Sequence, residues 1–282
     1  MSDFDPPRGV VAQVVTMALA EDFGILGDIT SLATIPRGAL AGAAFVARGA
    51  GVVAGTASAT EVFRQVDRSV VVTWFVTDGS TVVPGTVLGE VSGYTRSLLA
   101  GERVALNLLS HLSGVATLTR RYVDAIAATG AATRVRDTRK TLPGLRALQK
   151  AAVRAGGGAN HRDSLSDAVL VKDNHLAVLG IAEAVAAARD RWPGRVVEVE
   201  CDTLEQVAAA VDAGCDLVLL DNMAVAEVRT AIELLAGAIP VEVSGRVSLD
   251  DVGEYAAAGA DYIAVGAITH SVPVFDIGLD LG

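Results

Sequence analysis

Basic side chains are concentrated in one stretch of this sequence. Residues 134–172 hold nine of the chain's 23 Lys and Arg residues but only three acidic ones. All three lysines of the chain, Lys140, Lys150 and Lys172, lie within this stretch. An ammonium group makes point contacts with phosphate or carboxylate, whereas a guanidinium binds the same anions through two parallel hydrogen bonds. The pattern therefore predicts a local pocket for small polyanions.

Small residues accompany some of these basic residues. Arg139-Lys140 lies beside Thr141 and Pro143-Gly144, and His161-Arg162 follows Gly156-Gly157-Gly158. Glycine-containing loops let a ligand approach backbone amides, so both basic pairs are expected to bind the ligand together with Lys172. Three other basic residues, Arg146, Lys150 and Arg154, are spaced by four. For these, a solvated helical face or a structural role is as compatible with the spacing as ligand binding is.

Short apolar segments in the second half end in polar residues or glycine turns. If these segments are parallel strands of one barrel, their ends share the rim where such barrels carry their active sites. The rim residues would be Lys172, Glu200, Asp221, Ser244-Gly245 and Gly266. Glu198 lies two residues before Glu200 and so faces the same way, into the barrel. Inward carboxylates such as Glu198 and Glu200 need a partner, which could be a cation, substrate hydroxyls or a nearby lysine, and Lys172 is a candidate.

Two segments 45 residues apart repeat one pattern. Residues 203–220 align without a gap with residues 248–265. Each copy starts with a hydroxyl residue suited to a helix N-cap, has acids in the first turn, ends the helix at Ala-Gly and continues as an apolar strand. Further apolar segments at 168–171, 196–199 and 240–243 extend the alternation of strands and helices. We expect a closed or nearly closed β/α barrel, with a doubly wound sheet less favoured because no glycine-rich dinucleotide loop is present.

The first half has a different pattern. Residues 8–20 are expected to form a helix, and residues 40–93 are rich in β-branched runs typical of strands, with turns at Asp78-Gly79 and Pro84-Gly85. Apolar residues at helical spacing follow from 98 to 128, with a break expected near Ser113-Gly114. We place a domain boundary at that break.

Composition excludes several classes of protein. The chain has 282 residues, of which 51% are hydrophobic and 4% aromatic, so aliphatic side chains must form a large core. A formal charge of -10 argues against nonspecific binding to nucleic acid or acidic membranes. The spacing of Cys201 and Cys215 fits neither a zinc site nor a disulfide framework, and the acidic, Pro-rich N-terminus is unlike a signal peptide. These features favour a cytoplasmic protein that neither spans nor binds membranes.

The motifs of the basic segment resemble those of a known family. Residues 136–146 (RDTRKTLPGLR), the triple glycine with Asn160-His161-Arg162, and the run from Lys172 to His175 are similar to quinolinate phosphoribosyltransferases. Further matches follow in family order over nearly the whole chain, including Glu198-Val199-Glu200 and Leu220-Asp221-Asn222.

The resemblance implies an α/β fold in three parts. These are an N-terminal α/β sandwich domain at 1–112, an incomplete β/α (TIM-like) barrel at 113–270, and a C-terminal segment at 271–282 that returns to the first domain. It implies a homodimer or higher even oligomer, with Arg103 donated across the interface. The implied reaction joins quinolinate to phosphoribosyl pyrophosphate with Mg2+ and gives nicotinate mononucleotide, pyrophosphate and carbon dioxide.

The resemblance also implies roles for individual residues. The catalytic residues would be Lys140, Lys172, Glu200 and Asp221. Quinolinate would be held by Arg103, Arg139, His161, Arg162 and Lys172. Phosphoribosyl pyrophosphate would contact Lys140, its ribose hydroxyls or Mg2+ would contact Glu200 and Asp221, and its 5-phosphate would contact Ser244, Gly245, Gly266 and Ala267. The substrate-binding set is completed by Thr138, Arg246 and Val265.

Three alternatives remain open from the sequence. One is a paralogous phosphoribosyltransferase of the same fold with another acceptor, such as nicotinate or the substrate of the paralogue found with molybdenum-transport genes. Another is a sugar-phosphate isomerase or aldolase that uses Lys172 as a Schiff-base nucleophile. A third, a binding surface for RNA or an acidic protein, is the least favoured because the basic segment lacks interleaved aromatic residues for base stacking.

Overall fold

The computed structural model describes residues 4–282, and the chain forms two compact units. The N-terminal unit comprises residues up to Arg120, Thr141–Gly157 and Ile268–Gly282. The barrel unit comprises Arg121–Lys140 and Gly158–Ala267. Compared with the domain limits expected from the sequence, 112/113 and 270/271, this grouping assigns residues 113–120, 141–157 and 268–270 to the N-terminal unit.

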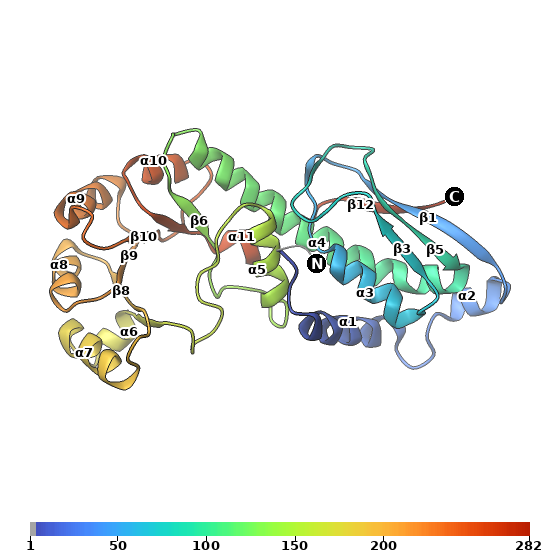
Figure 1. Cartoon of the computed structure of the whole chain (residues 1–282), viewed down its shortest axis with the longest axis horizontal. Helices are drawn as coiled ribbons and strands as arrows, with labels where there is room; N and C mark the ends of the chain where they lie inside the picture. Colours follow the sequence, from blue (N-terminus) through green and yellow to red (C-terminus); the bar gives the residue numbers. More distant parts are fainter. Residues whose placement is uncertain (1–3) are drawn as a thin grey trace. The chain divides into compact units, whose positions relative to one another are not determined.

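The N-terminal unit is built on an antiparallel sheet with the strand order β12-β1-β5-β3. Its strands are β1 (Leu40–Ala47), β3 (Val71–Trp74), β5 (Val87–Tyr94) and β12 (Ile277–Leu281), and a separate two-stranded ladder joins β2 (Gly51–Val52) to β4 (Thr81–Val82). Helices α1 (Arg8–Phe23), α3 (Thr56–Val66) and α4 (Thr95–Ala127) run along one face of the sheet (Figure 1). The remaining helices are α2 (Ile29–Thr34), α5 (Arg146–Ala155) and α11 (Ala267–His270). Phe45 of β1 stacks on Trp74 and meets Phe63 of α3 edge-on, which fixes the helix layer against the sheet.

Helix α3 lies inside the region whose composition predicts strands. Its N-terminus is capped from a distant part of the chain, because the buried Asp78 carboxylate accepts hydrogen bonds from the backbone N–H groups of Gly55 and Thr56 at 2.8 and 3.2 Å. Asp78 lies 22 residues from Thr56, so no local capping residue marks the start of this helix.

The predicted break at Ser113-Gly114 is wrong, because α4 is continuous through both residues. Gly114 instead permits a close approach, since a Cβ atom at this position would lie 2.4 Å from the carbonyl oxygen of Pro273. Ser113 also serves packing, as its hydroxyl accepts a hydrogen bond from Ala54 N–H at 3.0 Å. A glycine in a helix is therefore not evidence of an end when another segment packs against it.

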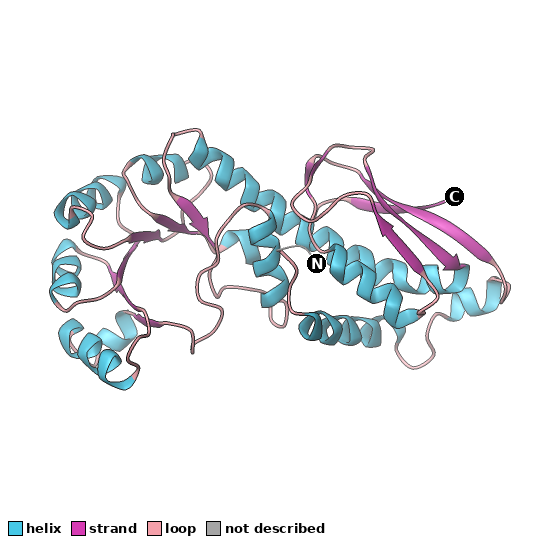
Figure 2. Ribbon diagram, in the orientation of Figure 1, coloured by secondary structure: helices cyan, strands magenta, loops and turns pink. Residues whose placement is uncertain are grey.

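The barrel unit contains six parallel strands in the order β6-β11-β10-β9-β8-β7. They are β6 (Arg134–Arg136), β7 (Val169–Val171), β8 (Val197–Cys201), β9 (Leu217–Asp221), β10 (Val241–Ser244) and β11 (Tyr262–Ala264). The sheet is curved, and β6 and β7 form its two edges, so the cylinder is incomplete (Figure 2). The α/β fold class, with an antiparallel N-terminal sheet and an incomplete barrel, is confirmed.

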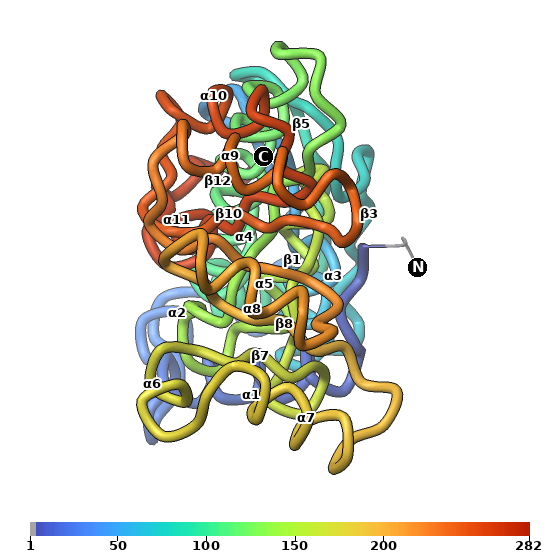
Figure 3. The backbone as a smooth tube through the Cα atoms, turned by 90° about the vertical axis from the view of Figure 1, so that its left-hand side faces the viewer, coloured from blue at the N-terminus to red at the C-terminus, as the bar shows by residue number. Residues whose placement is uncertain are grey.

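Helices cover the convex side of this curved sheet, as Figures 1 and 2 show. They are α6 (Asp173–Leu176), α7 (Ile181–Arg191), α8 (Leu204–Asp212), α9 (Val225–Leu235) and α10 (Val252–Ala257). In Figure 3 they follow one another in sequence order from α6 and α7 at the bottom to α9 and α10 at the top. In the described part of the chain, no helix combines the length and the apolar character needed to cross a membrane.

Both copies of the 45-residue repeat form a helix followed by a strand, α8–β9 and α10–β11. Thr203 caps α8 as expected, accepting the backbone N–H of Gln206 at 3.3 Å. Each helix is followed by a left-handed glycine, Gly214 at φ 78° and Gly259 at φ 104°. The second helix is shorter because a turn, in which Ser248 N–H donates to Asp251 Oδ1 at 2.7 Å, delays its start.

Candidate active site

A cavity of about 330 Å³ opens among the carboxyl ends of the barrel strands. Side chains alternate along a strand, so residues two apart face the same way. Glu200, Asp221 and Ser244 therefore lie above a deeper level of inward-facing residues on the same strands. The cavity is lined by Thr138, Arg139, Lys140, His161, Arg162, Leu170, Lys172, Glu200, Leu219, Asp221, Glu242, Ser244 and Ala264.

Most residues predicted for the site come together here. The lining includes Thr138, Arg139, Lys140, His161, Arg162, Lys172, Glu200, Asp221 and Ser244, which derive from six separate stretches of the barrel unit. Convergence of cations with two carboxylates in one concave space is the arrangement expected for a bound polyanion and a metal ion.

The predicted phosphate-binding residues other than Ser244 lie beyond the cavity lining. Gly245 has φ 102°, and a Cβ atom there would lie 2.5 Å from Asn222 N, so this turn requires glycine. Arg246 is exposed and also adopts a left-handed φ of 54°. Val265 is buried after β11, where its N–H donates to Arg136 O at 2.9 Å. Gly266 follows it and Ala267 begins α11.

Arg103 belongs to the N-terminal unit and is not part of this lining. It is exposed on α4 and lines a cavity of about 510 Å³ in that unit, together with Asn107, Ser110 and Phe275. A larger cavity of about 820 Å³ lies beside α1 and α3, but there Arg64 is already engaged by Glu61. Size alone therefore does not identify the site, and the cation-rich barrel cavity is the better candidate because it gathers the predicted residues.

Two carboxylates, Glu200 of β8 and Asp221 of β9, face the cavity from the ends of neighbouring strands. Lys172 Nζ forms an ion pair with Glu200 Oε2, and Asn222 Nδ2 donates to Asp221 Oδ2 at 2.7 Å. Burial raises the pKa of Glu200, while the Lys172 ammonium acts in the opposite direction. Lys172, Glu200, Asp221 and Ser244 together form the level that we call the rim.

A wall of cations is formed by Arg139, Lys140 and Arg162. Arg162 is anchored by a 2.9 Å hydrogen bond from its Nη1 to Ala168 O, and the Thr138 hydroxyl accepts Lys140 N–H at 2.9 Å. Burial, followed by repulsion from Arg139, lowers the pKa of Arg162. An anion bound between these two guanidinium groups would relieve that repulsion.

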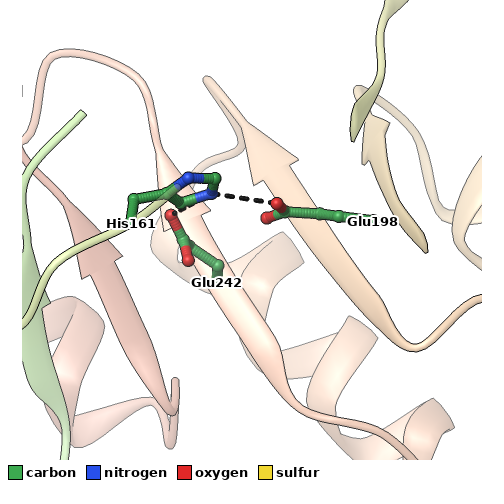
Figure 4. Close-up of side chains that lie close together, drawn as sticks. All are labelled: His161, Glu198 and Glu242. Atoms are coloured by element: carbon green, nitrogen blue, oxygen red, sulfur yellow. Dashed lines mark hydrogen bonds and ion pairs between the residues drawn. The ribbon is translucent and has the colours of Figure 1, made fainter. Parts of the chain in front are cut away.

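Below the rim lies a second cluster, here called the floor, made of Arg136, His161, Glu198 and Glu242. His161 Nε2 lies 2.9 Å from Glu198 Oε2 and 3.6 Å from Glu242 Oε1 (Figure 4). Arg136 Nη1 donates to Glu242 Oε2 and its guanidinium lies 4.0 Å above the Tyr262 ring. Glu198 and Glu242 are both buried.

Lys172, the predicted partner for the inward carboxylates Glu198 and Glu200, forms an ion pair with Glu200, whereas His161 binds Glu198. Lys172 follows β7 and so meets the rim carboxylate at the end of β8, whereas Glu198 lies two residues deeper. The sequence did direct attention correctly to Glu198 as an inward carboxylate that needs a partner.

Sequence reasoning missed Glu242, Arg136 and Asp137. A signal existed for Glu242, because Val241-Glu242-Val243 repeats the pattern Val197-Glu198-Val199 of a single acid between buried β-branched residues. Burial and the nearby Glu198 charge raise the pKa of Glu242 to about 7. Asp137 is fully buried and holds the loop of His161, accepting its backbone N–H at 2.9 Å and the Asn160 side-chain amide.

Family models match both halves of the chain. The model described as the quinolinate phosphoribosyl transferase N-terminal domain matches residues 28–113, and the one described as the C-terminal domain matches residues 115–280. The chain is 44% identical over 285 residues to nicotinate-nucleotide pyrophosphorylase [carboxylating] of Mycobacterium leprae, covering 99% of this chain and 98% of that protein. It is 40% identical to the chloroplastic protein of that name from Oryza sativa subsp. japonica, covering 95% and 76%.

Solved structures agree with this assignment. Nicotinate-nucleotide pyrophosphorylase from Francisella tularensis superposes with a TM-score of 0.93 at 37% identity, covering 99% of this chain and 98% of that one. The protein of that name from Ehrlichia chaffeensis gives a TM-score of 0.92 at 37% identity, covering 96% and 98%. The matches span both sheets and the residues that converge on the barrel cavity, and the chain belongs to the quinolinate phosphoribosyltransferase family.

Proposed function

We propose that the chain transfers the phosphoribosyl group of phosphoribosyl pyrophosphate to the ring nitrogen of quinolinate and releases pyrophosphate and carbon dioxide, giving nicotinate mononucleotide in NAD biosynthesis. The observation that carries this proposal is the convergence of Arg139, Lys140, Arg162 and Lys172 with Glu200 and Asp221 in one cavity. Few small substrates need this much positive charge, and a pyridine dicarboxylate beside a diphosphate ester does.

Quinolinate is a dianion, and its two carboxylates require separate cationic contacts. Arg139 and Arg162 bind them from the cationic wall, and Lys172 contributes a point charge from the rim. His161 lines the same cavity, but its Nε2 faces Glu198 and its Nδ1 accepts Arg162 N–H at 2.7 Å. We therefore assign His161 a role in holding the Arg162 loop in place for the substrate.

The diphosphate end is bound by Lys140, and the 5-phosphate by the turns at Ser244-Gly245 and Gly266-Ala267, with Thr138, Arg246 and Val265 supporting these loops. As pyrophosphate leaves, C1 of the ribose becomes positively charged. Glu200 and Asp221 face the cavity and stabilise that charge, while Lys140 stabilises the leaving group. Attack by the ring nitrogen then gives a cationic ring, which draws the electron pair left at C2 when carbon dioxide departs.

We propose Mg2+ as the cofactor, bound at Glu200 and Asp221. The donor set fits, because carboxylate oxygens on adjacent strand ends, completed by substrate phosphates, are what this ion prefers. When bound, Mg2+ would neutralise charge on the diphosphate. Glu200→Gln and Asp221→Asn are expected to raise the Mg2+ concentration needed for half-maximal activity, which a titration of rate against Mg2+ measures.

We further propose a homodimer, or a higher even oligomer, in which Arg103 of one protomer completes the site of the other. Its exposed position on α4, at a cavity wall in the N-terminal unit, supports this role. Mixing inactive Arg103→Ala and Arg162→Ala proteins after subunit exchange should restore about a quarter of wild-type activity, because half of the dimers then hold one intact site. No restoration would assign Arg103 to the site of its own chain or to no site.

The central experiment incubates the protein with quinolinate, phosphoribosyl pyrophosphate and Mg2+ and measures nicotinate mononucleotide. Nicotinate is assayed in parallel as the acceptor. Product from nicotinate alone would overturn the proposed acceptor in favour of a paralogous activity. We propose the cytoplasm as the compartment, a choice supported by the free thiols of Cys201 and Cys215, whose pKa values burial raises to about 12 and about 11.

A further inference from the structure

The proposed reaction needs a proton as well as two substrates. When the C2–carboxylate bond breaks, carbon dioxide leaves and the electron pair remains at C2 next to the cationic ring nitrogen. That pair must bond to a proton to give the C2–H of the product. A group beside the ring that holds a proton at neutral pH and can release it would complete the step.

Glu242 has the required surroundings. It is fully buried, lines the cavity and uses one oxygen, Oε2, to accept from Arg136. Its other oxygen, Oε1, has no hydrogen-bond partner among the residues that the structure describes. The charged or titratable groups facing it are Glu198 from β8, His161 from the loop after Gly158, Arg136 from β6 and the ladder neighbour Tyr262 from β11. Burial and Glu198 raise its pKa to about 7, while His161 and Arg136 act in the opposite direction.

The hydrogen bonds of His161 show which carboxylate holds the proton. Its Nδ1 accepts Arg162 N–H at 2.7 Å, so the ring carries its proton on Nε2, which donates to Glu198 Oε2 at 2.9 Å. Glu198 Oε2 is thus engaged by a hydrogen-bond donor, whereas Glu242 Oε1 has none among the described residues. Glu242 is therefore the floor carboxyl to which we assign the proton, in line with its burial and its raised pKa. The proton on Nε2 also occupies the position that a metal ion would need among these three side chains.

We propose that Glu242 is the acid that donates its proton to C2 of the pyridine ring as carbon dioxide leaves. The proton passes from Glu242 Oε1 to the electron pair at C2, and Glu242 becomes a carboxylate that solvent reprotonates after product release. An anionic substrate in the cavity favours the protonated form of Glu242 in the complex. This inference rests on the proposed function, because it supplies the last bond of that reaction.

The test separates the two chemical steps in a single turnover with quinolinate and phosphoribosyl pyrophosphate. Glu242→Gln keeps the shape of the side chain but has no acidic proton. Formation of pyrophosphate should stay within about threefold of wild type, whereas carbon dioxide release should slow by about 10²- to 10⁴-fold, with a ribosylated dicarboxylate accumulating. Equal slowing of both steps would show a structural role only, and no slowing of either would also overturn the proposal.

Glu198→Gln is the matched control. It changes the other floor carboxylate and leaves the acid in place, so carbon dioxide release should stay within about tenfold of wild type. Its decline at high pH should begin at a lower pH, because the Glu198 charge that raises the pKa of Glu242 is gone. If Glu198→Gln slows carbon dioxide release as much as Glu242→Gln does, the proton does not come from Glu242.

A measurement on the unaltered protein covers the case in which Glu242→Gln does not fold. Carbon dioxide release should fall about tenfold per pH unit above the pKa of Glu242 in the complex, because the protonated form is required. Pyrophosphate formation should not decline in this way at high pH. The assignment would be overturned if both steps declined together, or if carbon dioxide release did not decline at pH values well above neutrality. Failure of the unaltered protein to form any nicotinate mononucleotide would instead overturn the proposed function.

Discussion

The rim and the floor of the barrel cavity both place a glutamate on β8, Glu200 and Glu198, two positions apart on the same strand. Glu200 at the rim is partly exposed and pairs with Lys172, whose side chain is 41% exposed. Glu198 and Glu242 on the floor are buried, and their partners are His161 and Arg136. The charged groups near the cavity opening are therefore accessible to ligands, whereas those deeper in the barrel are paired with other protein groups. Rim variants should mainly affect catalysis, and floor variants should also affect stability or proton transfer.

The largest effect is expected on the floor. Arg136→Met removes the cation that pairs with Glu242 and should lower the free energy of unfolding by about 3–5 kcal/mol at pH 8, because it leaves a buried charge unpaired. The loss should shrink at pH 5, where Glu242 is neutral in the folded protein. Urea denaturation at both pH values measures it. The control Arg229→Met, an exposed position on α9, should change stability by less than about 0.5 kcal/mol.

Variants of the cationic wall should lose activity rather than stability. Arg139→Ala should lower kcat/KM for quinolinate, because a bidentate contact to a carboxylate is lost. The loss should correspond to about 2–4 kcal/mol of transition-state stabilisation, while folding remains near normal. Arg139→Lys should recover only part of the loss, since it restores the charge but not the planar fork. An Arg139→Ala enzyme with near-normal kcat/KM would contradict the assignment of the wall to the substrate.

A smaller effect on stability follows from the raised pKa of Glu242. In the folded protein Glu242 keeps its proton up to about pH 7, whereas in the unfolded chain it loses it near 4.5, so this group lowers stability as pH rises between these values. Glu242→Gln cannot ionise and should therefore gain on the order of 2 kcal/mol relative to wild type between pH 5 and pH 8. The test compares the unfolding free energies of Glu242→Gln and wild type across that pH range. If Glu242 ionises near its ordinary pKa, the difference between the two proteins will not change with pH, and the prediction is wrong.

The smallest change in stability is expected at the rim. Lys172→Met breaks the ion pair with Glu200, but the ammonium is accessible to water, so unfolding should become easier by less than about 1 kcal/mol. Activity should nevertheless fall strongly, because the same ammonium faces the cavity. If Lys172→Met lost as much stability as Arg136→Met, the proposed difference between the rim and the floor would be wrong. Thermal unfolding and initial rates on the same preparation provide both measurements.

Local patterns account for most of the fold and for the rim. The repeat at 203–220 and 248–265 predicted two helix–strand units that the structure contains, and the polar residues after the apolar strands predicted Lys172, Glu200, Asp221 and Ser244 in the cavity lining. Such features depend on neighbours a few residues away. They are therefore readable from the chain itself.

The features that the sequence did not reveal depend on distant contacts. The partner of Glu198 is set by where a loop far along the chain places His161, α3 is capped by Asp78 from outside the helix, and Gly114 faces Pro273 across the N-terminal unit. Lys150 gives the same lesson, because its spacing allowed a solvated helical face and its side chain is in fact 2% exposed. Spacing identifies a face but not what covers it.

Strand β12 has a consequence for how the protein is made. It pairs with β1 from Ala43 opposite Leu281 to Ala47 opposite Ile277, so one edge of the first sheet is completed by residues 277–281. During translation β1 leaves the ribosome long before its neighbour exists, and its edge must stay shielded while more than half of the chain is synthesised. Chaperones that hold exposed strand edges should therefore matter more for this protein than for one whose sheet closes locally, and loss of the last few codons should leave a nascent product prone to aggregation.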